Sequence, residues 1–243
     1  MASQRLMRCE DRESLVARTA TLLLDSMRRR QHASGSVSLS LTGGDLANEV
    51  YDHVALAASD SAVKASDVHL WWNWDFFVAT DNPDRNSLQA LSRLAGVWSL
   101  DPAKIHPIPS SSVSSDPEAG AAQYVQEMAE NPRIDICLLE LRPDGRVAGI
   151  FPRHLDPPSS AWAVGVTDAS MAHRELVTLT RAGLNACTEI WIMASGEDVA
   201  DAVRSALAGD LACPASHLTG AHSVMWLVDE AAVADVSFHH CTL

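Results

Sequence analysis

One turn near the middle of the chain combines residue types that could hold an anion or activate water. Residues 138–152 read LLELRPDGRVAGIFP, in which an apolar run typical of a strand breaks at Pro143-Asp144-Gly145 and then resumes. This pattern predicts a strand, a tight turn and the start of a helix. The first side chain after the turn is Arg146, whose guanidinium can hold an anion but cannot accept a proton. The turn belongs either to an active site or to the remains of one.

A second turn carries glycines suited to anion binding. The alternating residues Ser36 to Leu41 predict a strand that stops at Thr42-Gly43-Gly44, after which Asp45 predicts the N-cap of a helix. A strand, a glycine turn and a helix N-terminus present backbone N–H groups to an anion. Many α/β units use two glycines only to turn, so this motif alone is a weak signal.

The elements that must position these turns alternate along the chain. Short apolar runs rich in β-branched residues and tryptophan are separated by windows of helical periodicity. This alternation favours an α/β fold with a mostly parallel sheet and helices on both faces. The expected further strands are residues 68–72, 134–141, 161–166, 190–194 and 224–228, and the expected further helices are residues 11–30, 84–98, 116–130 and 196–207.

Composition and charge restrict the classes of partner. The chain has 243 residues, 47% hydrophobic and 20% charged, with a formal net charge of -13. This charge repels polyanions, and we expect neither nucleic acid nor a membrane as a partner. The five cysteines show no CxxC spacing, and neither a signal peptide nor a membrane span is visible, so we expect a cytoplasmic protein.

The residues nearest to a metal motif are His239, His240 and Cys241. Adjacent histidines usually point apart, and no second ligand pair has a matching spacing. No metal site is therefore expected.

Six stretches, in order over nearly the whole chain, carry a family resemblance. They are LSLTGGDLA at 39–47, LWWNWDFFVATDNPDRN at 70–86, IDICLLELRPDGRVAGIFP at 134–152, LVTLT at 176–180, IWIMASGEDVADAV at 190–203 and WLVDEA at 226–231. In order and spacing they resemble the 6-phosphogluconolactonase family, relatives of the glucosamine-6-phosphate deaminases. The resemblance implies one Rossmann-like domain over residues 1–243, hydrolysis of 6-phosphogluconolactone in the pentose phosphate pathway, and no metal or cofactor.

The central turn departs from the pattern that this family shows. Asp144 and Gly145 are retained, but Glu140 and Arg142 replace two glycines, and Arg146 stands where the family has its general-base histidine. Lactone hydrolysis needs a water deprotonated near neutral pH, a task that a guanidinium cannot perform. The side chains of Glu140 and Arg142 are also expected to enter space that the family leaves open.

The phosphate-binding positions depart as well. Thr42, Gly43 and Gly44 are kept from the family's phosphate loop, but Asp45 follows them, and its carboxylate could occupy the anion site itself. Met171 and Leu176 take the positions of the family's phosphate-binding lysine and arginine. Trp74 and Phe76 replace an acid and an arginine of the family, and Asp75 is a shortened form of its glutamate. Asn86 is retained, and Arg174 could reach inward if its loop shifts.

Two hypotheses follow from these departures. In the first, the protein has largely lost lactonase activity and acts as a binding or regulatory module. Its ligand or partner is a small sugar phosphate, another protein or a second copy of the chain, and the binding surface lies around the aromatic residues Trp74 and Phe76. In the second, it is an active lactonase or sugar-phosphate hydrolase with a rebuilt site. The candidate catalytic residues are Asp144, Arg146 and His154, and the candidate substrate-binding residues are Thr42, Gly43, Gly44, Asp75, Asn86, Arg142 and Arg174.

Overall fold

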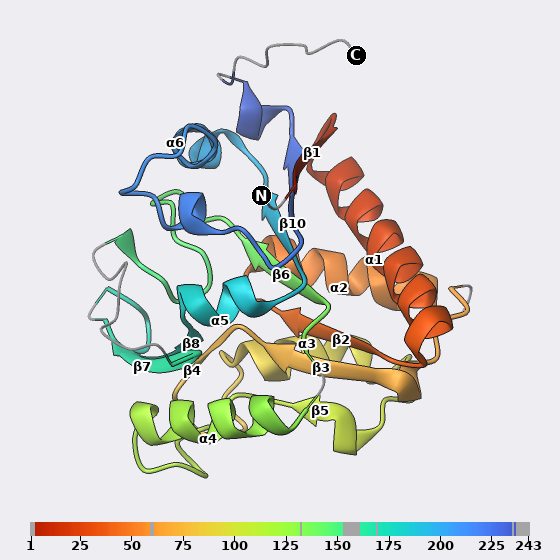
Figure 1. Ribbon diagram of the computed structural model, residues 1–243, viewed down its shortest axis with the longest axis vertical. Helices are drawn as coiled ribbons and strands as arrows, with labels where there is room; N and C mark the ends of the chain where they lie inside the picture. The colour runs from red at the N-terminus through yellow and green to blue at the C-terminus, as the bar shows by residue number, and fades with distance from the viewer. Residues whose placement is uncertain are drawn as a thin grey trace.

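The strands form two sheets of different construction (Figure 1). The computed structural model describes residues 3–58, 61–131, 133–152, 161–168, 170–234 and 236, and within them the larger sheet is parallel, with strand order β1-β10-β9-β6-β2-β3-β5. Its strands are β1 (Ser3–Cys9), β2 (Val37–Leu41), β3 (Val68–Trp72), β5 (Ile105–His106), β6 (Ile136–Glu140), β9 (Glu189–Ala194) and β10 (Ser223–Asp229). A separate antiparallel sheet has the order β4-β8-β7, comprising β4 (Trp74–Phe76), β8 (Glu175–Leu179) and β7 (Ala163–Thr167).

Helices cover both faces of the parallel sheet, which confirms the expected mostly parallel, Rossmann-like α/β fold. The helices are α1 (Arg12–Ser34), α2 (Asp45–Ala57), α3 (Asn86–Leu94), α4 (Pro117–Glu130), α5 (Arg181–Ala186) and α6 (Ala200–Leu207). The first three pack side by side on one face, and α4 and α5 lie on the other face (Figure 1). Every residue of β2 and of β6 is buried, as expected for central strands of a parallel sheet.

The longest helix shows how local sequence sets the boundaries. Asp11 is the N-cap of α1, and its carboxylate accepts a hydrogen bond from the backbone N–H of Ser14 at 2.8 Å. The helix ends at Gly35, which adopts a left-handed φ of 85°. The sequence therefore encodes both ends of the element that connects β1 to β2.

The strand expected at 161–166 is confirmed as β7, which pairs antiparallel with β8 and lies outside the parallel sheet. The expectation of a helix directly after the Asp144 turn was wrong: no helix forms within residues 146–151, where Ala148 adopts a φ of 51° and Val147 bridges Ile150. The residues after Gly145 instead fold back as a tight loop beside the carboxyl end of β6.

The order of the strands places a crevice between β2 and β6. From β2 the chain proceeds outward through β3 and β5, and it then returns to β6 on the other side of β2. Parallel α/β sheets bind ligands outside the carboxyl ends of strands at such a reversal. The loops that follow Leu41 and Glu140 lie at this point.

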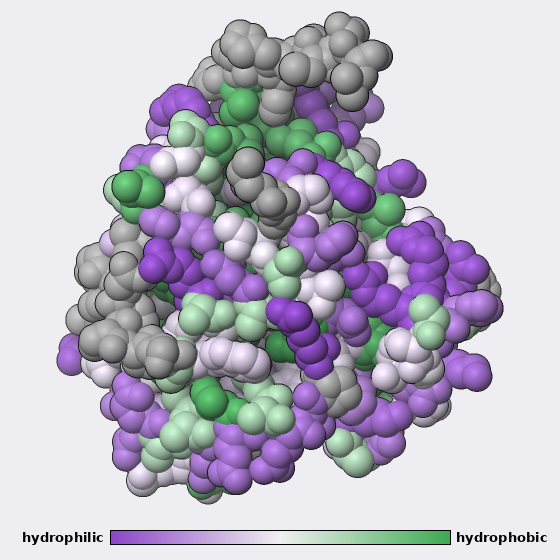
Figure 2. All heavy atoms as spheres, in the orientation of Figure 1, coloured by the Kyte–Doolittle hydropathy of each residue, from purple (hydrophilic) through white to green (hydrophobic). Residues whose placement is uncertain are grey.

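Among the residues that the structure describes, no helix is long and apolar enough to cross a bilayer. On the face shown in Figure 2, hydrophobic residues form small separate groups among hydrophilic ones. The most exposed large hydrophobic side chains, Leu56 and Leu211, come from α2 and from the loop after α6.

Candidate active site

A cleft of about 300 Å³ opens at the carboxyl ends of β2 and β6. Its walls come from the glycine loop and first turn of α2, from β4 and the start of α3, from the turn after β6, and from the loop before β8. The lining residues are Gly43, Gly44, Asp45, Asn48, Trp74, Phe76, Asp84, Asn86, Gln89, Glu140, Arg142, Arg146, Ala148, Met171 and Ala172. Residues separated by more than one hundred positions in the sequence thus share one site.

The N-terminus of α2 is occupied by a carboxylate of the chain itself. Glu140 is 8% exposed, and its Oε2 accepts a hydrogen bond from the backbone N–H of Ala47 at 3.0 Å. Its Oε1 pairs with Arg142 Nη1 at 2.8 Å. Burial raises the pKa of Glu140, while the Ala47 N–H and the guanidinium of Arg142 oppose that shift. Glu140 therefore accepts from one of the N–H groups at the helix terminus that a bound anion would otherwise use.

The two glycines of the α2 loop allow side chains of this chain to approach the backbone closely. A Cβ atom at Gly44 would lie 2.2 Å from Glu140 Oε2, and a Cβ atom at Gly43 would lie 1.8 Å from Asn86 Oδ1. Gly44 also has a φ of 131°, which side chains with a Cβ rarely adopt. The glycines are thus required by the contacts with Glu140 and Asn86.

Asp45 does not hold the anion position, contrary to the expectation from sequence. It is the first residue of α2, its side chain is exposed, and the N-cap residue is Gly44. The buried carboxylate that bonds to the first turn of α2 comes from Glu140, 93 residues after its bonding partner Ala47. The expectation that the side chains of Glu140 and Arg142 enter this space is confirmed, since both line the cleft.

Arg146, at the position of the expected base, points along the cleft wall. Its Nη1 lies 2.9 Å from the sulfur of Met171, and its guanidinium carbon lies 4.7 Å from the centre of the Phe151 ring. The backbone N–H of Arg146 donates to Asp144 Oδ1 at 3.1 Å, so Asp144 closes the turn and lies outside the cleft lining. The turn supplies a cation to the cleft and no group that could accept a proton near neutral pH.

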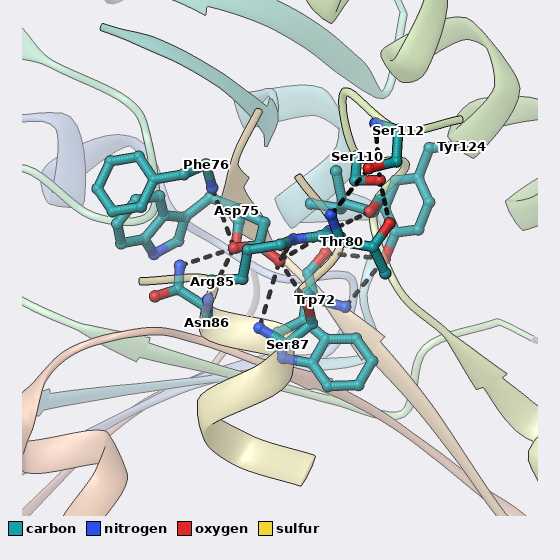
Figure 3. A network of polar contacts seen from close by, with 12 residues as sticks. Trp72, Asp75, Phe76, Thr80, Arg85, Asn86, Ser87, Ser110, Ser112 and Tyr124 are labelled. Atoms are coloured by element: carbon teal, nitrogen blue, oxygen red, sulfur yellow. Dashed lines mark hydrogen bonds and ion pairs between the residues drawn. The ribbon is translucent and has the colours of Figure 1, made fainter. Parts of the chain in front are cut away.

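Asp75 lies beneath the cleft floor in a closed polar network (Figure 3). The side chain is fully buried, and its carboxylate accepts hydrogen bonds from the backbone N–H groups of Asn86 and Ser87 and from the Ser87 hydroxyl. Arg85, 2% exposed, forms an ion pair with it at 3.0 Å. Burial raises the pKa of Asp75, and Arg85 is the strongest opposing influence. The network fixes the start of α3 against β4, and it uses the carboxylate that sequence reasoning assigned to substrate.

A histidine and a carboxylate meet at the rim of the cleft. His173 Nε2 lies 2.7 Å from Asp84 Oδ2, and the His173 ring packs edge to face against Phe76, with ring centroids 5.0 Å apart. Asp84 and Phe76 both line the cleft. His173 was not among the candidate residues selected from the sequence, and no local signal links it to Asp84 because 89 positions separate them.

The structure brings together only part of the predicted site. Gly43, Gly44, Asn86, Arg142 and Arg146 line the cleft. Thr42 is buried behind it, and its backbone N–H and C=O both bond to the Tyr51 hydroxyl. Arg174 is exposed and outside the lining, so the inward loop shift is not seen. His154 and the pair His239 and His240 lie outside the described residues.

Two amide side chains that the sequence analysis did not select, and the aromatic pair that it named, complete the cleft. Asn48 donates to Gln89 Oε1 at 2.9 Å, which joins α2 to α3 across one wall. Trp74 and Phe76 form a nearly perpendicular aromatic pair, with ring centroids 5.2 Å apart and an interplanar angle of 81°. No group of three or more metal-ligating side chains occurs among the described residues.

Known proteins match nearly the whole chain in sequence. Residues 10–226 match the model of the family described as glucosamine-6-phosphate isomerases/6-phosphogluconolactonase. A protein of Streptomyces coelicolor named 6-phosphogluconolactonase is 33% identical, and the match covers 93% of this chain and 92% of that protein. A protein of the same name from Mycobacterium leprae is 29% identical, with 93% and 96% covered.

Solved structures share the fold at lower identity. A structure described as devB protein has a TM-score of 0.85 at 22% identity and covers 97% of this chain and 100% of its own. The 6-phosphogluconolactonase of Thermotoga maritima has a TM-score of 0.82 at 18% identity, with 93% and 100% covered. These likenesses show that the α/β fold is shared over 93% to 97% of this chain.

Proposed function

Because this chain belongs to the family of glucosamine-6-phosphate isomerases and 6-phosphogluconolactonases, we propose that it keeps the family's cleft as a binding site but has lost most or all lactonase activity. In this proposal the protein acts as a binding or regulatory module in the cytoplasm. The ligand or partner is held at the cleft opening, beside Trp74 and Phe76.

The observation that carries this proposal is the identity and surroundings of Arg146. It stands where the resemblance places the histidine base, and its guanidinium contacts Met171 and Phe151. No histidine is among the described residues that line the cleft. A guanidinium keeps its proton at neutral pH, so Arg146 cannot take the proton of an attacking water as a histidine would.

The arrangement of charge supports the same proposal. The two lining cations stand beside three lining carboxylates, those of Asp45, Asp84 and Glu140. Arg142 is paired with Glu140, and the α2 N-terminus is bonded to the same carboxylate. A phosphate ester entering here would meet an internal anion at the position of most favourable potential.

Turnover of freshly generated 6-phosphogluconolactone, corrected for spontaneous hydrolysis, tests the proposal. We expect the native protein to remain at the background rate. An Arg146→Lys variant is the matched control, because it keeps the charge and introduces no base of suitable pKa. A native rate well above background would overturn the proposal.

The pair of His173 and Asp84 favours a second candidate, a hydrolase with a rebuilt base. Asp84 would orient the imidazole, and the second ring nitrogen would take a proton from water as its oxygen attacks the lactone carbonyl. The ring C–O bond would then break, and the ring oxygen would be protonated. In this case His173→Gln would lower turnover about 10²–10⁴-fold, whereas Arg146→Lys would leave a rate above background.

A further inference from the structure

The side chain of Glu140 affects which ligands the cleft can accept, and this effect is separate from the loss of a base. It is nine-tenths buried, charged, and bonded to the first turn of a helix 13 residues long. A buried carboxylate is costly unless it is paired and hydrogen-bonded, and here Arg142 and the Ala47 N–H meet that need. Removing Glu140 from this position would leave both partners exposed to the cleft.

The rest of the lining resembles a site for hydroxyl groups more than a site for phosphate. Trp74 and Phe76 supply aromatic surface, and Asn48, Asn86 and Gln89 supply side-chain amides. An amide has two donor hydrogens and an acceptor oxygen with two lone pairs, so each of these amides retains capacity beyond its internal bonds, of which Gln89 makes two. Aromatic faces with a few amides and carboxylates suit a small polyhydroxylated ring.

We propose that Glu140 is a specificity-determining residue that takes the place of a ligand's phosphate, so that the cleft selects an unphosphorylated sugar or sugar acid over its phosphate ester. The inference rests on the proposed function, since it concerns the ligand of the same cleft. A phosphate would have to displace the Glu140 carboxylate from Ala47 and Arg142 or stand beside it with like charge. A neutral hydroxyl group can be accommodated next to the carboxylate as a hydrogen-bond donor.

The experiment compares binding within matched pairs of ligands by calorimetry, with the purified full chain. The probes are glucose and glucose 6-phosphate, gluconate and 6-phosphogluconate, and glucosamine and its 6-phosphate. For the native protein we expect the unphosphorylated member of at least one pair to bind about tenfold or more tightly than its phosphate ester.

Three variants assign that preference to Glu140. Glu140→Gly removes both charge and volume, and the preference should invert toward the phosphate ester by about tenfold or more. Glu140→Gln removes the charge alone and should reduce the preference without inverting it. Glu49→Gln is the charge control on α2, the helix to which Glu140 is bonded, because Glu49 pairs with Arg12 outside the cleft lining, and it should leave the preference unchanged.

Three results would overturn the inference. They are equal or tighter binding of the phosphate esters by the native protein, no binding of any of these ligands, and an unchanged preference in Glu140→Gly when circular dichroism shows that this variant is folded. None of them depends on lactone turnover. Loss of lactonase activity is therefore tested separately from the choice of ligand.

Discussion

At the scale of single residues, Glu140 performs at the N-terminus of α2 the electrostatic task of a bound anion. A carboxylate at a helix N-terminus typically contributes about 0.3–1 kcal/mol, and up to about 2 kcal/mol in a partly buried geometry. Burial opposes this gain, and it is the largest influence on the pKa of Glu140, which it raises above the ordinary value of 4.5. The folded state therefore binds the Glu140 proton more tightly than the unfolded chain does.

This difference predicts a pH-dependent effect of Glu140→Gln on stability. Between the unfolded pKa and the raised folded pKa, the folded protein holds more protons, so the contribution of Glu140 to stability falls as pH rises through that window. Glu140→Gln does not lose stability in this way, because its side chain has no carboxyl group to titrate. Urea unfolding at a series of pH values should show Glu140→Gln becoming more stable relative to the native protein as the pH rises above about 4.5. A constant difference across that range would show that the carboxylate titrates alike in both states.

Only part of the chemistry of single residues could be predicted from the sequence. That Arg146 cannot serve as a base follows from its chemistry alone, and so does the expectation that Glu140 fills space. The bond from Ala47 to Glu140 depends on register: Ser40 pairs with Cys137, so continuing the two strands by three residues brings Gly43 level with Glu140. No local pattern encodes that register, and Asp45 was selected instead because it is adjacent in sequence.

At the scale of elements, the junction of β4 and α3 depends on one buried ion pair. Asp75 bonds to the first two N–H groups of α3 and to Arg85, which also donates to the carbonyl of Ile108 (Figure 3). Removing one partner of a buried pair leaves the other charge uncompensated, at a cost of about 3–5 kcal/mol.

Asp75→Ala should therefore lower the free energy of unfolding by about 3–5 kcal/mol. Asp84→Ala is the control from the loop preceding α3, because Asp84 is exposed and its pairing with His173 should contribute no more than about 1 kcal/mol. Equilibrium urea unfolding of the two variants measures both values. Equal, small losses would mean that the Asp75 network does not hold the junction.

At the edge of the sheet, three side chains form a second polar network, which should make stability depend on pH. His69 Nδ1 of β3 lies 3.1 Å from His106 Nε2 of β5, and His106 Nδ1 lies 2.6 Å from Glu127 Oε1 of α4. Burial, followed by the charges of His106 and Lys104, lowers the pKa of His69, and Asp101 opposes this shift. The unfolded chain thus takes up the His69 proton at a higher pH than the folded protein does.

Stability should consequently fall as pH drops below about 6.5, because protons bind preferentially to the unfolded state. His69→Gln should show a smaller loss of stability than the native protein between about pH 7 and about pH 5. Urea midpoints at the two pH values provide the measurement. Parallel losses in both proteins would exclude His69 as the titrating group.

Most of the strands could be predicted because their residues show a clear hydrophobic pattern in the sequence. β3 has the predicted bounds, and β2, β6, β9 and β10 match within one or two residues. β1 was missed because it is an edge strand with exposed polar residues. The direction of β7 could not be read from its own residues, since it is set by pairing with β8.

At the scale of the whole molecule, the reversal of strand order between β2 and β6 explains why a cleft persists while its chemistry changes. The sheet and its covering helices fix where the loops meet, and the side chains on those loops fix what the site can do. The α/β class was therefore predictable from alternating elements. The assembly of Glu140, Arg142 and the α2 terminus required the folded chain.

The most direct test is the rate of 6-phosphogluconolactone hydrolysis by this protein measured beside the Streptomyces coelicolor relative, with spontaneous hydrolysis subtracted. If the cleft lacks a base, kcat/KM of this protein should lie at least about 10²–10⁴-fold below that of an active relative. The relative serves as the positive control for the freshly prepared lactone. A kcat/KM within about tenfold of the active relative would contradict the loss of lactonase activity and direct attention to His173 and Asp84.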